Sequence, residues 1–121
     1  MHSRSVSAFR AAVQLARSVV EATAKDKKIV TGTLNSKIDE LYNQSFIRGH
    51  IRDGAHEVRH LGNEMAHGDF IDPVTADEAD LVLTLMSEIL EEVYQSPARV
   101  TRAQAARAAK KAGKGAGEAY A

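Results

Sequence analysis

Apolar residues recur every three or four positions along most of the chain, which is the spacing of one face of an α-helix. The pattern predicts four amphipathic helices, over about residues 5–25, 33–44, 47–67 and 75–95. No stretch alternates apolar and polar residues between hairpin turns, so no strand is predicted. Each helix has one apolar face and the connections are short. We therefore expect an all-α fold, an up-down bundle of four main helices.

The apolar faces of these helices form the predicted core. The first face is widened by Ala12, Leu15 and Val19, and the fourth by Leu83, Leu85 and Leu90. The remaining core positions are Phe9, Val13, Ala16 and Val20, then Leu34, Ile38, Leu41 and Tyr42, then Ile47, Ile51, Ala55, Val58 and Met65, and finally Ala79, Val82, Met86, Ile89 and Val93. Gly62 lies among them and costs a helix about 1 kcal/mol relative to alanine, so we expect it to mark the close approach of another backbone.

Two local signals bound the fourth helix. Thr75 and Glu78 have the spacing of a capping box, in which each side chain accepts a hydrogen bond from the other residue's backbone amide. Ser96 and Pro97 are predicted to end the helix, because proline lacks a backbone donor and its ring clashes with the preceding turn.

Charge divides the chain after Pro97. Residues 1–97 hold 10 Lys and Arg against 15 Asp and Glu, whereas residues 98–121 hold 6 against 1, so net charges of −5 and +5 cancel to zero. We expect a helical-bundle domain over residues 1–97 and a mobile basic tail over 98–121, helical or disordered because alanine offers little area for docking. The candidate nucleic-acid-binding residues are the tail cations Arg99, Arg102, Arg107, Lys110, Lys111 and Lys114.

Composition narrows the remaining classes of function. The chain has 121 residues, enough for one domain, and no cysteine, which excludes disulfides, thiolate nucleophiles and Cys-ligated zinc. No apolar run approaches the roughly 20 residues that span a bilayer, and the first residues lack the order of a secretion signal. We therefore expect a cytoplasmic protein without a membrane partner.

The third predicted helix carries four of the five histidines. Residues 56–60 read His-Glu-Val-Arg-His, the H-E-x-x-H pattern in which His56 and His60 bind zinc and Glu57 is the general base. The extended metalloprotease pattern also requires a glycine and a further histidine downstream. Here Gly62 and His67 are each displaced by one position from the places that the pattern requires. No third ligand follows at the required place, so we expect no metal and no other cofactor.

Arg59, Asn63 and His67 are spaced i, i+4 and i+8 on the same helix and form a polar ridge. One interpretation is catalytic: arginine and histidine bind a phosphate and move protons around it, and Asn63 orients them. The other is structural, with His67 at the helix C-terminus, where a cation meets the helix dipole favourably, and Asn63 tied to a neighbouring helix.

Residues 58–68, Val-Arg-His-Leu-Gly-Asn-Glu-Met-Ala-His-Gly, resemble the signature of the domain of unknown function 4145 family, whose members read roughly iRxlGNxaaH. The most specific positions are Arg59, Gly62, Asn63 and His67. The resemblance covers about residues 5–97. Further landmarks agree in order and spacing: Ala16-Arg17 to Glu21, Leu34 to Ile38 to Leu41, Thr75 to Glu78, and Val93-Tyr94.

This resemblance implies a small helical domain that occurs beside restriction-endonuclease, helicase or other defence-associated modules in bacteria and archaea. It also implies a distant likeness to the HEPN superfamily, helical bundles that include metal-independent ribonucleases. Those enzymes pair two copies of an Arg-polar-x-x-x-His motif across a dimer interface. Asn63 and His67 fit the second half of the motif, whereas Gly62 stands in place of the arginine and Arg59 lies one turn earlier.

Three functional hypotheses result. The first is a non-catalytic binding or assembly module of a prokaryotic nucleic-acid-related or defence system, self-associating as a homodimer, with nucleic acid bound through the basic tail. The second is a metal-independent endoribonuclease that acts as a dimer through Arg59, Asn63 and His67. The third is a zinc hydrolase that uses His56, Glu57 and His60.

Overall fold

A computed structural model describes residues 2–66 and 74–118, which contain helices and no strand. In chain order the elements are α1 (His2–Asp26), α2 (Leu34–Asn43), α3 (Gly49–Ala66), α4 (Ala76–Leu90), a π-helical segment η1 (Glu91–Gln95) and α5 (Ser96–Glu118). The first four helices lie close to the predicted ranges. None of the helices in the described part of the chain is both long and apolar enough to cross a membrane.

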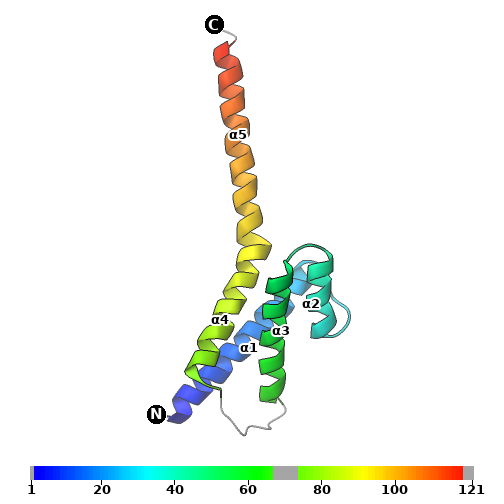
Figure 1. Cartoon of the computed structure of the whole chain (residues 1–121), viewed down its shortest axis with the longest axis vertical. Coiled ribbons are helices and arrows are strands. Elements are labelled where there is room, and N and C mark those ends of the chain that lie inside the picture. Colours follow the sequence, from blue (N-terminus) through cyan, green and yellow to red (C-terminus); the bar gives the residue numbers. More distant parts are fainter. Residues whose placement is uncertain (1, 67–73, 119–121) are drawn as a thin grey trace.

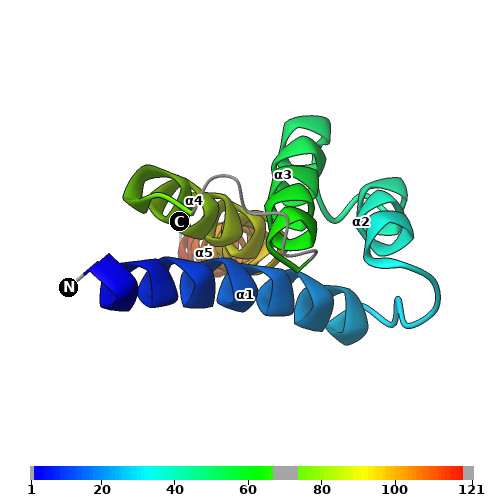
Figure 2. The same cartoon turned by 90° about the horizontal axis from the view of Figure 1, so that it is seen from below.

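Helices α1 to α4 pack together, which confirms the predicted four-helix arrangement. Helix α1 contacts α2, α3 and α4, while α3 lies between α2 and α4 (Figures 1 and 2). The buried core includes apolar residues from all four helices, such as Val20, Ile38, Val58 and Ile89. Their burial supplies the main favourable contribution to folding.

Some predicted core positions differ from the structure. Leu15 is 54% exposed and Tyr42 is 39% exposed. Tyr42 lies at the edge of the buried face of α2, whereas Leu15 lies about 130° around α1 from the centre of its buried face. Conversely, Thr23, Ala24 and Ile29 are buried although the periodic pattern did not include them. Thr23 satisfies its hydroxyl by donating to the backbone oxygen of Val19 at 2.7 Å.

Helices α1 and α2 both end in a turn that uses a left-handed residue other than the usual glycine. After α1, the amide of Ile29 donates to Ala24 O and that of Lys28 donates to Lys25 O, and Lys28 has a φ of 68°. After α2, Phe46 and Ser45 make the corresponding bonds, and Ser45 has a φ of 67°. These are Schellman motifs, which direct Ile29 and Phe46 back against the bundle.

The predicted capping box of α4 is confirmed. The Glu78 amide donates to Thr75 Oγ1 and the Thr75 amide donates to Glu78 Oε1, both at 3.1 Å. Thr33 caps α2 in the simpler way, by accepting from the amide of Ser36 at 3.2 Å.

The predicted helix end at Pro97 is wrong, because the chain stays helical from α4 through η1 into α5. Proline cannot donate a backbone hydrogen bond and would clash with the carbonyl four residues earlier in a regular α-helix. In the turn before Pro97 the hydrogen-bond pattern widens: the Ser96 amide donates to Glu91 O, five residues back. The π-helical turn thus changes the register next to the proline, and helical structure continues past it.

Two polar contacts fix η1 to the bundle. Tyr94 donates its hydroxyl to Asp26 Oδ2 at 2.6 Å, at the end of α1. Burial raises the pKa of Tyr94 to about 12, and the hydrogen bond and negative charge of Asp26 add to the shift. On the other side, Glu92 Oε2 accepts from the backbone amide of Arg48 at 2.7 Å, just before α3.

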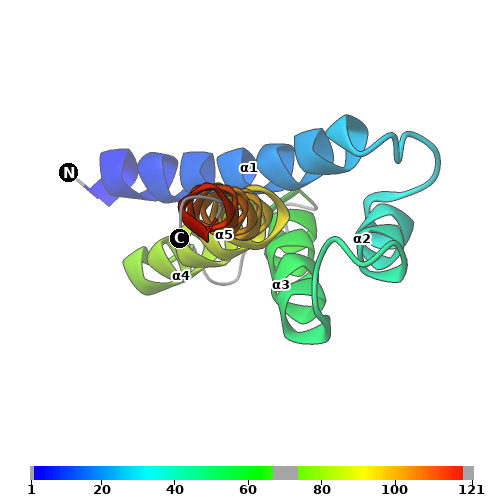
Figure 3. The same cartoon turned by 90° about the horizontal axis from the view of Figure 1, so that it is seen from above.

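Beyond η1, α5 leaves the bundle. It extends away from the other helices (Figure 1), and in the view along it from above it is seen nearly end-on (Figure 3). Helix α5 packs against η1 and contributes no buried side chain over its described residues. The tail is therefore helical, the first of the two predicted forms.

Candidate functional site

Asn63, one of the candidate catalytic residues, joins α3 to α1. Its Oδ1 accepts a hydrogen bond from Arg17 Nη1 at 2.7 Å. Arg17 also donates through Nε to Glu21 Oε1 at 3.3 Å, one turn further along α1. The guanidinium thus bridges a carboxylate of its own helix and the amide of another. This arrangement matches the structural interpretation of Asn63, with Arg17 as the partner.

Gly62 makes room for this contact. It is buried, and a Cβ placed on it would lie 3.3 Å from both Cδ and Nη1 of Arg17. The prediction that another backbone approaches Gly62 is therefore wrong, since the neighbour is the Arg17 side chain. Glycine and asparagine act together here: the first removes a side chain from the path of the guanidinium, and the second accepts its hydrogen bond.

Arg59 lies in a different cluster, on the side of α3 that faces α2. Its Nε donates to His56 Nδ1 at 3.1 Å, and its Nη2 lies 3.3 Å from His60 Nε2. His56 Nε2 lies 2.8 Å from Asp39 Oδ1 of α2. Because Arg59 Nε can only donate, the proton of His56 resides on Nε2, where it is donated to the carboxylate. Asp39, His56, Arg59 and His60 therefore form one hydrogen-bonded chain.

The structure thus separates two residues that the sequence placed on one ridge. Asn63 binds α1 through Arg17, whereas Arg59 binds His56 and His60. His67, the third candidate, lies outside the described residues. Arg59 and Asn63 are therefore hydrogen-bonded to different partners.

The zinc-binding candidates are likewise engaged within the protein. Both ring nitrogens of His56 take part in the hydrogen bonds to Asp39 and Arg59. Glu57 is exposed and makes no hydrogen bond to these histidines. Within residues 2–66 and 74–118, no group of three or more His, Asp or Glu side chains is arranged to hold a metal ion.

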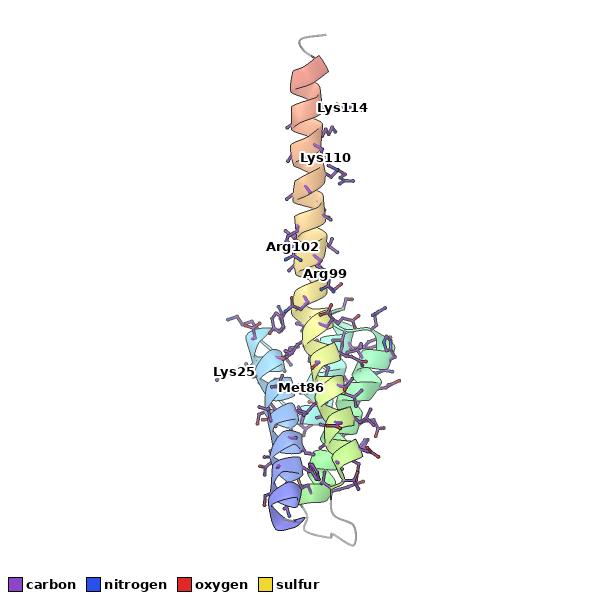
Figure 4. The ribbon with its side chains drawn as sticks, turned by 90° about the vertical axis from the view of Figure 1, so that its left-hand side faces the viewer. Lys25, Met86, Arg99, Arg102, Lys110 and Lys114 are labelled. Atoms are coloured by element: carbon purple, nitrogen blue, oxygen red, sulfur yellow. The ribbon has the colours of Figure 1, made fainter. Side chains whose placement is uncertain are left out.

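The tail cations are the most accessible of the candidates. Arg99, Arg102, Lys110 and Lys114 are distributed along α5 beyond the bundle (Figure 4). All six candidates, including Arg107 and Lys111, are exposed. Arg99 pairs with Glu91 at the base of α5, and the other five have no ion-pair partner in the part of the chain that the structure describes.

Arg17 contacts a candidate site residue, although the sequence did not predict Arg17 as part of the site. The spacing from Arg17 to Glu21 is part of the family pattern, but the contact of Arg17 with Asn63 joins residues 46 positions apart in the sequence.

The model of the family described as a domain of unknown function (DUF4145) matches residues 1–111, so the match continues past Pro97 into α5. No curated protein and no solved structure matches the chain.

Proposed function

Since the chain belongs to the DUF4145 family, which is defined by a domain and not by an activity, we propose that it is a non-catalytic binding or assembly module whose partner-binding element is α5. The observation that carries the proposal is the placement of α5. It is a 23-residue helix with exposed side chains throughout residues 96–114, and among the described elements it packs only against η1. Helices in proteins gain most of their stability from packing an apolar face.

The charge of α5 indicates the chemistry of the partner. Five cations on this one helix have no ion-pair partner among the described residues, and together they create a positive potential that attracts polyanions or acidic protein surfaces. Nucleic acid is one such partner, and its binding to Lys and Arg releases counterions from the phosphates. An acidic surface of another protein molecule is the other.

The geometry of α3 supports a non-catalytic role. A ribonuclease of the kind that the family resemblance implies needs its arginine, polar residue and histidine at one phosphate. Here the Arg59 side chain is held by two histidines, and the Asn63 side chain is held by Arg17. Both side chains would have to leave these partners to act together.

The resemblance also supplies the setting that we propose. The module belongs to a prokaryotic nucleic-acid-related or defence system in the cytoplasm and works as a homo-oligomer. The helical architecture of the described residues is compatible with this role.

The experiment compares the full chain with a chain truncated after Pro97. Fluorescence anisotropy measures binding of a labelled single-stranded RNA and a labelled DNA duplex over a salt series, and sedimentation velocity measures self-association. We expect truncation to abolish at least one of these interactions. The proposal fails if both are unchanged, or if the full chain cleaves the RNA in the presence of EDTA.

A further inference from the structure

A groove between α3 and α4 has apolar walls and an acidic rim. Leu61 of α3 and Leu81 and Leu85 of α4 line it, and Leu81 is 60% exposed. Exposed leucine on a small domain is unremarkable alone, but here it adjoins two further leucines in a concave surface. The groove therefore offers an apolar surface against which an element from outside the bundle can pack.

Carboxylates border the same groove. Glu57 and Glu64 lie two turns apart on α3, and Glu78 lies at the start of α4. Glu78 is engaged in the capping box. Glu57 and Glu64 are exposed and have no ion-pair partner among the described residues. An occupant with cations at its edges would meet this rim favourably.

Helix α5 has the complementary surface. At about 100° per residue, six of its small side chains gather on one face, Arg102 falls on one border of that face, and Lys111 lies about 60° beyond the other border. Arg107 and Lys114 fall on the opposite side. The small face consists of Ala98, Thr101, Ala105, Ala108, Ala109 and Ala112. A face of small side chains lets a helix lie close to the leucines of the groove.

The groove of a molecule is out of reach of its own α5. Helices α4 and α5 follow one another without a break, and α5 leads away from the bundle (Figure 1). We propose that α5 of one copy lies in the α3–α4 groove of a second copy, and that the exchange is reciprocal. Because α5 extends α4, reciprocal docking across a two-fold axis places α5 antiparallel to α4 of the other copy.

Charge complementarity favours a second copy over nucleic acid as the occupant. Residues 1–97 have a net charge of −5 and residues 98–121 a net charge of +5. In this arrangement the basic α5 of each copy lies against the acidic bundle of the other, and the opposite charges attract. The acidic rim of the groove would repel phosphates. The inference rests on the proposed role of α5 in binding and specifies the partner as this same chain.

The contact is expected to be salt-sensitive and of moderate strength. Alanine supplies little apolar area, so the leucines of the groove and the flanking charges provide most of the attraction. Ion pairs at the edge of such a contact are screened by salt. We expect a dimer with a dissociation constant on the order of micromolar at low salt, weakening as salt is added.

Charge exchange between two variants tests this arrangement. The groove variant is Glu57→Lys with Glu64→Lys, and the α5 variant is Arg102→Glu. Each alone should dimerise about tenfold or more weakly than the wild type, because like charges meet at both contacts. Mixed in equal amounts, they should form a heterodimer near wild-type affinity, since both of its contacts join opposite charges. Sedimentation equilibrium on the full chains measures all three affinities.

A matched control separates local contact from overall charge. Arg107→Glu changes the net charge by the same amount as Arg102→Glu, on the far side of α5. We expect this control to dimerise within about threefold of the wild type. Its mixture with the groove variant should associate more weakly than the charge-exchange pair, because one of the two contacts in that heterodimer joins like charges. Far-UV circular dichroism establishes that all variants remain helical.

Several results would overturn the inference. These are a wild-type chain that is monomeric at about 100 μM and low salt, a dimer that survives truncation after Pro97, or a mixture of the two variants that does not recover. If the chain is monomeric and truncation abolishes binding to the labelled nucleic acids, the inference fails and the proposed function stands. If truncation changes neither association nor nucleic-acid binding, both fail.

Discussion

The two halves of the long C-terminal helix have the same backbone structure and opposite surroundings. Helix α4 buries Val82 and Ile89, which are 3% and 1% exposed, whereas Val100 of α5 is 53% exposed. Helix α4 carries carboxylates and α5 carries cations. Helix α4 buries side chains in the core, whereas the described side chains of α5 are all exposed. Helical structure alone therefore does not distinguish an element that packs in the core from one that extends beyond it.

The sharpest test of this difference is truncation of one aliphatic side chain in each half. Ile89→Ala should destabilise the protein by about 2–5 kcal/mol, since it leaves a cavity in the core. Val100→Ala should change the free energy of unfolding by less than about 0.5 kcal/mol, as expected for an exposed side chain. Chemical denaturation at low protein concentration measures both. Equal losses would show that α5 is packed as firmly as α4.

A second comparison removes one polar contact from each region. Asn63→Ala leaves Arg17 Nη1 without its acceptor in a half-buried site, so we expect a loss of about 1–3 kcal/mol. Arg99→Ala removes an ion pair with Glu91 that is about half exposed on both sides, and such pairs contribute roughly 0–1 kcal/mol. Thermal and denaturant unfolding compare the two variants.

Unfolding curves combined with an RNA-cleavage assay separate a structural from a catalytic role for the polar residues of α3. We expect Asn63→Ala to be clearly destabilised and the wild type to show no cleavage of single-stranded RNA in EDTA. Cleavage that disappears in Arg59→Ala or His67→Ala, with unchanged unfolding curves, would instead establish the ribonuclease hypothesis.

The joint between the two halves predicts a smaller, pH-dependent effect. The Tyr94 pKa is raised from 10.0 to about 12 in the folded chain. Its contribution to stability should thus be complete below pH 10 and lost as the pH rises toward 12, because the unfolded chain releases the proton first. Tyr94→Phe should lose less stability than the wild type over this interval. Ultraviolet absorbance of the phenolate checks the titration, and a midpoint near 10 would contradict the folded-state contact.

The smallest effect should come from removing α5 entirely. Truncation after Pro97 deletes no buried side chain in the described chain, so the free energy of unfolding should change by less than about 0.5 kcal/mol. The measurement must be made at a concentration where the full chain is monomeric, because dimerisation adds concentration-dependent stability. A large loss under those conditions would show that α5 supports its own bundle.

The fold could be predicted from the sequence because the spacing of apolar residues indicates helices directly, and the first four helices of the structure lie close to the ranges that it predicts. Local backbone features account for what the sequence pattern left out or predicted wrongly. Lys28 and Ser45 adopt positive φ values at helix ends where glycine would be the usual signal. Pro97 was expected to stop a helix, and the π-helical turn before it allowed the helix to continue. Neither feature has a distinct pattern in the sequence.

The site was less predictable than the fold for a geometric reason. Spacing places Arg59 and Asn63 on neighbouring positions of α3, but spacing does not specify which partner each long side chain will bind. That choice depends on Arg17 of α1 for Asn63, and on His56 and His60 for Arg59. The contacts of Arg59 with His56 and His60 join residues that are close in the sequence. The contact with Arg17 required knowledge of how α1 crosses α3.

The π-helical turn also determines the azimuth of α5. A regular α-helix turns by about 100° per residue, so the extra residue in this turn sets back every side chain of α5 by about one such step relative to α4. Removing one residue from Glu91–Gln95 would thus rotate Arg102 and Lys111 around the helix axis with their chemistry unchanged. The five residues of the π-helical turn therefore set the directions in which the cations of α5 point relative to the bundle.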